Sequence, residues 1–117
     1  MSKHSKIGEQ GELIASDFLE KKGYKLLFRN WRAGKKEIDL IMLEGDTAIF
    51  VEVKTRNSTR LAFPEEFVTS AKKHNFKVAS EYFLAEFQNI KWVRFDIIGI
   101  VLVNGGIEEV VHFEDAF

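Results

Sequence analysis

Three charged residues lie within two of the most apolar segments of the chain. Asp39 belongs to IDLIML (residues 38–43), and Glu52 and Lys54 belong to TAIFVEVK (residues 47–54). A charge inside a buried strand is costly unless it is paired or liganded. The two carboxylates could bind a divalent cation, and the lysine could activate water or stabilise charge on a phosphate. The three residues are therefore candidates for metal-assisted phosphodiester hydrolysis.

The two segments form the clearest β-hairpin of the sequence, and its register decides whether the carboxylates meet. If residues 45–46 form a two-residue turn, Asp39 lies directly opposite Glu52. Opposed residues share a face with Cβ atoms ~5 Å apart, where two carboxylates repel unless a cation lies between them. Mg²⁺, with Mn²⁺ as the alternative, suits such an oxygen site. A three-residue turn would instead put Asp39 opposite Val51.

Each of these assignments has a plainer alternative. Lys54 could simply form an ion pair with Asp39 or Glu52, although one lysine serves two opposed carboxylates poorly. Glu12 is expected on the buried row of the first helix, as a third metal ligand or as a boundary residue that reaches solvent. Glu37 shares the strand face of Asp39 and is either a supporting ligand or the solvent end of the strand.

Apolar periodicity and turn residues predict the elements that position these side chains. Helices are expected at residues 5–22 and 67–87, and strands at residues 24–32, 38–43, 47–54, 91–103 and 107–113. The order αβββαβ plus an edge strand predicts the α/β class, with a mixed central sheet flanked by helices. We expect one domain over residues 1–117, with residues 1–4 and 114–117 frayed and 55–63 a mobile loop.

The composition excludes some classes of protein and points to one class of partner. Without cysteine there is no disulfide or thiolate metal site, and without ~18 consecutive apolar residues no membrane span is expected, so we predict a cytoplasmic protein. The net charge is −1, yet residues 21–36 hold seven basic residues and no acidic one. Such clustering is typical of polyanion binding, with a solvated basic face as the alternative. The candidates for phosphate contacts beside the site are Arg29, Arg32, Lys35, Lys36, Arg56 and Arg60.

Four segments resemble the YraN family of bacterial proteins. They are GEQGELIASDFLEKKGY, RNWRAGKKEIDLIM, IFVEVKTR and VRFDIIGI, which lie between residues 8 and 100. That family is similar to the PD-(D/E)XK, or restriction-endonuclease-like, superfamily, whose nearest well-understood members are archaeal Holliday-junction resolvases. The resemblance implies a restriction-endonuclease-like fold and Mg²⁺-dependent cleavage of structured or branched DNA.

The resemblance also implies roles for individual residues. Asp39 and Glu52 would be the metal-binding acids, Lys54 the catalytic lysine, and Glu12 the helical acid of the same site. Lys72 falls where many superfamily members keep a lysine or glutamine near the site, although it could equally be an exposed helix lysine. The glycine that usually precedes Glu-Ile-Asp is replaced by Lys36, which leaves the acids intact.

Two other functions compete with a nuclease. A nucleic-acid-binding module on the same fold would bind DNA with weak or partner-dependent catalysis, and a structural domain would use the charges as a buried ion-pair network. Trp31 is either a base-stacking residue or part of the core. His4, His74 and His112 have no metal-ligand spacing. Asp96 is expected to have a structural role, paired locally with Arg94 or with the loop. Cutting two strands would require a homodimer, which no sequence feature specifies.

Overall fold

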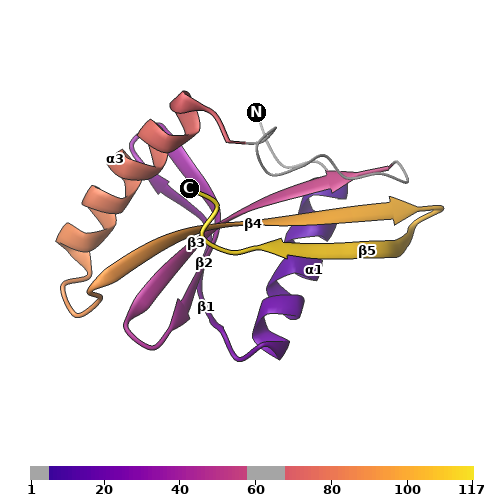
Figure 1. Ribbon diagram of the computed structural model, residues 1–117, viewed down its shortest axis with the longest axis horizontal. Coiled ribbons are helices and arrows are strands. Elements are labelled where there is room, and N and C mark those ends of the chain that lie inside the picture. Colours follow the sequence, from indigo (N-terminus) through magenta and orange to yellow (C-terminus); the bar gives the residue numbers. More distant parts are fainter. Residues whose placement is uncertain (1–5, 58–67) are drawn as a thin grey trace.

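The computed structural model describes residues 6–57 and 68–117, which form a five-stranded mixed sheet flanked by two helices (Figure 1). The elements follow the order α1 (Lys6–Lys21), β1 (Lys25–Ala33), β2 (Lys36–Glu44), β3 (Thr47–Arg56), α3 (Ser70–Glu86), β4 (Trp92–Val103) and β5 (Gly106–Phe113). The predicted α/β class is confirmed, and the order is compatible with an αβββαβ core. The expected fraying of residues 1–4 and most of the expected 55–63 loop lie outside the described residues.

The strand order in the sheet is the order in the sequence, β1-β2-β3-β4-β5. All neighbours are antiparallel except β3 and β4, which are parallel and are joined through α3. A parallel pair cannot be closed by a hairpin, so the chain needs this helical crossover. The β4–β5 hairpin turns at Asn104 and Gly105, whose φ angles of 52° and 79° suit a tight two-residue turn.

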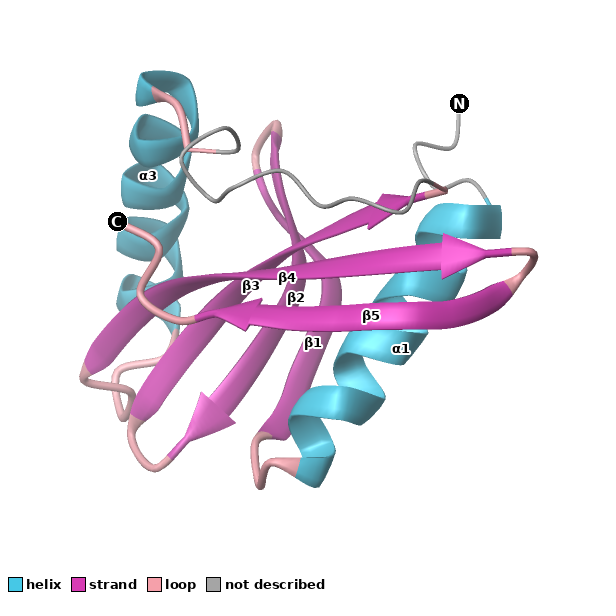
Figure 2. Cartoon of the chain, turned by 45° about the vertical axis from the view of Figure 1, so that its right-hand side comes forward, coloured by secondary structure: helices cyan, strands magenta, loops and turns pink. Residues whose placement is uncertain are grey.

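The two helices cover opposite faces of the sheet (Figure 2). Helix α1 packs Ala15 and Leu19 on one face, against a cluster that includes Leu40, Ile49 and Val51. Helix α3 covers the other face, where the buried side chains are largely aromatic, as the eleven phenylalanines of the chain predict. Phe50 packs there against Phe83 and Phe76, with ring centroids 5.3 Å and 5.5 Å away. None of the helices in the described ranges is long and apolar enough to cross a membrane.

The structure differs from the predicted boundaries in two places. Strand β3 continues through Thr55 and Arg56, which we expected in a loop, because both residues pair with β4. The tail at residues 114–117, expected to fray, is held in place. The Ala116 N–H donates to the Phe95 carbonyl at 2.7 Å, and the ring of Phe117 stacks on that of Phe95 at 4.4 Å. Aromatic stacking and a backbone hydrogen bond thus outweigh the entropy of a free tail.

Candidate functional site

The pairing of β2 with β3 ends in the interior of the sheet. From their two-residue turn the strands pair as far as Leu40 and Val51, in the predicted register. Beyond this point β2 remains paired with β1, and β3 remains paired with β4 to its last residue. In Figure 1 the β1–β2 pair turns up beside α3 while β3 runs to the right. The strands therefore separate at the next position, which carries Asp39 and Glu52.

A cavity of about 280 Å³ opens where the strands separate. It brings together residues of three strands and one helix: Glu37, Ile38, Asp39, Val51, Glu52, Val53, Lys54, Lys72 and Phe95. Three carboxylates and two ammonium groups thus share one small space. The structure gathers Asp39, Glu52 and Lys54 as the sequence predicts, together with both expected supporting residues.

Asp39 reaches from β2 to the neighbouring strand. Its Oδ2 accepts a hydrogen bond from the backbone N–H of Val53 at 2.9 Å, in the region where the strands no longer pair. Burial raises the pKa of Asp39, and the nearby charges of Glu52 and Glu37 raise it further. The Val53 N–H and the charge of Lys54 act in the opposite direction without cancelling the rise. The cavity therefore opposes the ionised form of Asp39, and a bound cation would reverse that effect.

Glu52 is contacted by two lysines at one oxygen atom. The Nζ of Lys54 lies 3.0 Å from Oε2 of Glu52, and the Nζ of Lys72 donates a hydrogen bond to the same Oε2. The ion pair expected as the plainer interpretation of Lys54 is therefore present, with Glu52 as its partner. Lys72 does not extend freely into solvent, because α3 directs it into the cavity.

Glu12 is buried, as predicted, with 5% of its surface exposed, but it is not among the residues that line the cavity. It lies on α1, which packs on β3 through the neighbouring Gly11. Across residues 6–57 and 68–117 we find no group of three or more Asp, Glu, His or Cys side chains placed to hold a metal ion. Of the predicted ligands, Asp39 and Glu52 remain the pair that could hold one, and Glu12 as a ligand stays a prediction.

Five of the six predicted phosphate-contacting residues lie in the described part of the chain: two on β1, one at the start of β2, one at the end of β3, and Lys35 in the turn between β1 and β2. Arg29, Arg32 and Arg56 are exposed and Lys36 is half-buried, whereas Arg60 lies outside the described residues. The guanidinium of Arg32 is 3.9 Å from the carboxylate of Glu37, which lines the cavity. Trp31 belongs to the core, because its ring packs against Phe83 with centroids 5.4 Å apart.

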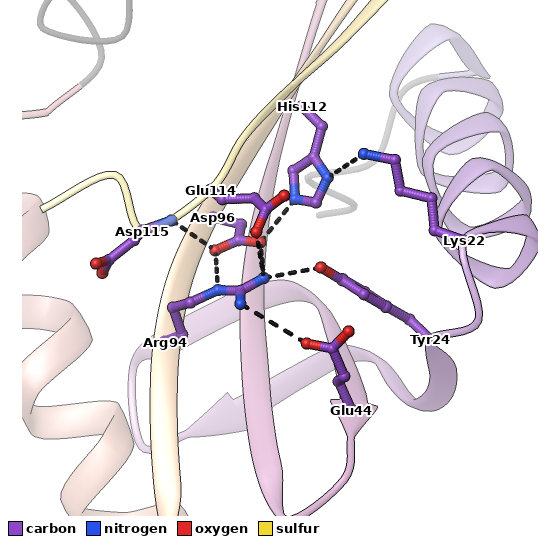
Figure 3. A network of polar contacts seen from close by, with 8 residues as sticks. All are labelled: Lys22, Tyr24, Glu44, Arg94, Asp96, His112, Glu114 and Asp115. Atoms are coloured by element: carbon purple, nitrogen blue, oxygen red, sulfur yellow. Dashed lines mark hydrogen bonds and ion pairs between the residues drawn. The ribbon is translucent and has the colours of Figure 1, made fainter.

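A second polar cluster lies around Asp96 of β4 (Figure 3). Asp96 is fully buried, and Arg94 donates to both of its carboxylate oxygens at 2.8 Å. His112 and the N–H of Asp115 contact the same carboxylate at 2.7 Å and 3.0 Å. Burial alone would raise the pKa of Asp96, but these hydrogen bonds outweigh it and the net pKa is lowered. The predicted structural pairing of Asp96 with Arg94 is confirmed.

The cluster also joins the end of α1 to the C-terminal strand. The Nζ of Lys22 lies 2.9 Å from Nδ1 of His112. An ammonium group only donates, so Nδ1 accepts, and we assign the proton of the neutral imidazole to Nε2, which donates to Asp96. The sequence alone indicates no role for His112. Its partner Asp96 lies sixteen residues away on another strand, so no local spacing signals the pair.

Comparison with known proteins identifies the family of the chain. A family model described as "Uncharacterised protein family UPF0102" matches residues 11–100, which include Glu12, Asp39, Glu52 and Lys54. The chain belongs to this family. Membership in UPF0102 confirms the expected YraN-family relationship.

Relatives within UPF0102 cover nearly the whole chain. A UPF0102 protein of Bacteroides fragilis is 37% identical over 117 residues, which cover 100% of this chain and 96% of the relative. A UPF0102 protein of Caldicellulosiruptor saccharolyticus is 38% identical over 114 residues, which cover 95% and 96% of the two chains. One of Rhodococcus opacus is 36% identical over 119 residues, with both chains covered completely.

Proposed function

We propose that the cavity hydrolyses phosphodiester bonds of structured or branched DNA with the help of a divalent cation. The main support is that Asp39, Glu52 and Lys54, three charged residues of two apolar strands, converge on one cavity at the point where these strands separate. The resemblance of the same motifs to PD-(D/E)XK nucleases supports the choice of reaction.

The donor set of the cavity suits a hard cation. Mg²⁺ is commonly held by one or two carboxylates, with water and substrate phosphate completing the shell. Asp39 and Glu52 supply two carboxylates. Burial, and after it the charges of Glu52 and Glu37, raise the pKa of Asp39, and a bound cation would favour its ionised form. The same two residues would hold Mn²⁺, since its oxygen preference is similar.

Three charged side chains of the cavity, and one beside it, have a proposed role in hydrolysis. A bound Mg²⁺ would lower the pKa of the attacking water and polarise the phosphate. Asp39 and Glu52 would hold the cation, and Lys54 stabilises the negative charge that develops on a phosphate oxygen. Arg32, beside the cavity residue Glu37, contacts the adjoining DNA backbone.

The direct test is cleavage of labelled duplex, single-stranded, flap and four-way-junction DNA with Mg²⁺ or Mn²⁺. We expect cleavage of at least one substrate, inhibited by EDTA and abolished by Asp39→Asn and by Lys54→Ala. Glu44→Gln is the matched control, because Glu44 is an exposed acid at the other end of β2 and should leave cleavage unchanged. Absence of cleavage of every substrate with both metals would contradict the proposal.

A DNA-binding module without its own turnover is the second candidate. It is favoured by the limited ligand set, since in the described part of the chain no three acidic side chains form a metal site. In that case Glu52→Gln would retain salt-dependent DNA binding, and the wild-type protein would show no cleavage with either metal. Binding isotherms at several salt concentrations, measured beside the cleavage assay, separate the two candidates.

A further inference from the structure

Oε2 of Glu52 carries the contacts of two lysines that reach it from different elements. Lys54 follows Glu52 on the same strand with one residue between them, and its Nζ is 3.0 Å from Oε2. Lys72 comes from α3 and donates to the same atom. The side chain of Glu52 is only 18% exposed, so this oxygen meets both ammonium groups in a largely enclosed space.

The position of Lys72 in α3 is electrostatically unfavourable for an ammonium group. It lies in the first turn of α3, and its backbone N–H donates to Oγ1 of the N-cap residue Thr69 at 3.1 Å. The first turn of a helix carries partial positive charge, which disfavours an ammonium group there. The contact with Glu52 compensates for this repulsion. A flexible four-carbon stem lets the ammonium move while the capped backbone stays in place.

A divalent cation at Asp39 and Glu52 would meet these two ammonium groups at close range. Like charges in a partly enclosed site repel more strongly than they do in water. Lys54 is tied to the strand that bears Glu52, whereas Lys72 approaches from a separate element and can withdraw without moving that strand. Lys72 is therefore the group whose contact the cation would replace.

We propose that Lys72 is a built-in competitor of the divalent cation. It neutralises Glu52 when the metal is absent and turns to the phosphate of bound DNA when the metal is present. This inference rests on the proposed metal-dependent function. It makes Lys72 a positioning residue that couples the two ligands: metal binding releases an ammonium group for the phosphate, and by linkage DNA binding strengthens metal binding.

The test measures metal affinity, without any turnover. Mn²⁺ is titrated into the wild-type protein and into Lys72→Met while free Mn²⁺ is followed by electron paramagnetic resonance. Lys72→Met removes the competing charge and keeps most of the side-chain volume, so we expect Mn²⁺ to bind at least about fivefold more tightly, a modest coupling between sites. Lys73→Met is the matched control. The Nζ of Lys73 lies 6.0 Å from the ring centroid of Phe117, and Lys73 does not line the cavity, so its removal should leave the affinity unchanged.

A second arm tests the coupling with uncleaved DNA. Mn²⁺ is titrated at low temperature in the presence of a short four-way junction in which sulfur replaces one non-bridging oxygen of each phosphate. DNA should tighten Mn²⁺ binding to the wild-type protein more than to Lys72→Met. Urea unfolding of each variant verifies that all are folded under these conditions.

The outcomes separate this inference from the proposed function. Equal or weaker Mn²⁺ binding by Lys72→Met, with measurable binding by the wild type, overturns the role of Lys72 alone. Absence of Mn²⁺ binding by the wild type and by both variants overturns the metal-dependent function together with this inference. Tighter binding by Lys72→Met but not by Lys73→Met supports it.

Discussion

The carboxylate of Asp39 accepts a hydrogen bond from the backbone N–H of Val53 at 2.9 Å, across the gap where β2 and β3 cease to pair. A side chain thus takes the donor that the neighbouring backbone no longer satisfies. The contact anchors Asp39 beside Glu52 and Glu37, two further acids of the cavity. The hydrogen bond at the end of the strand pair therefore also holds Asp39 close to two other carboxylates. The effect of this crowding on the free energy of unfolding can be measured.

Asp39→Asn should stabilise the protein at neutral pH. Burial, Glu52 and Glu37 raise the folded-state pKa of Asp39. The stabilising effect of the protonated carboxyl group is therefore fully present below the unfolded-state pKa, and it is lost as pH rises through the folded-state pKa. Removing the charge should raise the free energy of unfolding by about 1 kcal/mol at pH 7, a few degrees in Tm. The gain should shrink as pH is lowered toward about 4.

Thermal unfolding at several pH values measures this effect. Asp46→Asn is the matched control, since Asp46 is an exposed acid in the turn of the same hairpin. A lower Tm for Asp39→Asn than for the wild type at pH 7 would mean that the ionised carboxylate is a net stabiliser, contrary to our expectation.

Asp96→Ala should be strongly destabilising. The substitution leaves the guanidinium of Arg94 and the N–H groups of His112 and Asp115 without their buried acceptor. Breaking a buried pair on one side costs about 3–5 kcal/mol, so urea unfolding should show a loss near the lower end of that range. Glu44→Ala removes an exposed carboxylate 3.8 Å from the same guanidinium and should cost at most about 0.5 kcal/mol.

The lowered pKa of Asp96 also gives this pairing a pH dependence. Its stabilising effect is present above the unfolded-state pKa and is lost as pH falls through the lower folded-state pKa. Wild-type stability should therefore decrease below about pH 4, the ordinary range of an aspartate. The difference in stability between the wild type and Asp96→Ala should narrow over the same range; a difference that stays constant would contradict the assignment.

Gly11→Ala should weaken the packing of α1 on β3. A Cβ at Gly11 would lie 2.1 Å from Oγ1 of Thr55, well inside contact distance. Alanine favours the helix by roughly 1 kcal/mol, but overpacking costs about 1–3 kcal/mol, so the net change in the free energy of unfolding should be a loss. Thr55→Ala removes that hydroxyl. The double variant should therefore be at least as stable as Thr55→Ala alone, and urea unfolding of the four proteins completes the cycle.

Local spacing was enough to predict the part of the site that lies on the β2–β3 hairpin. Alternation put Glu52 and Lys54 on one face. A two-residue turn set the register, which the structure keeps as far as Leu40 and Val51, one residue short of the predicted Asp39–Glu52 pair. Both follow from the twofold repeat of a strand and from a short loop. Burial of Glu12 followed in the same way, from the repeat of a helix.

The rest depended on contacts between residues far apart in the sequence. The separation of β2 from β3 reflects different partners, β1 and β4, and no motif in either strand marks the residue where pairing ends. Lys72 reaches Glu52 from twenty residues away, and His112 reaches Asp96 from sixteen. The sequence by itself determined which residues share a face, because that depends on backbone periodicity. Only the tertiary structure decided which charges meet, because that depends on how α3, β4 and β5 pack around the sheet.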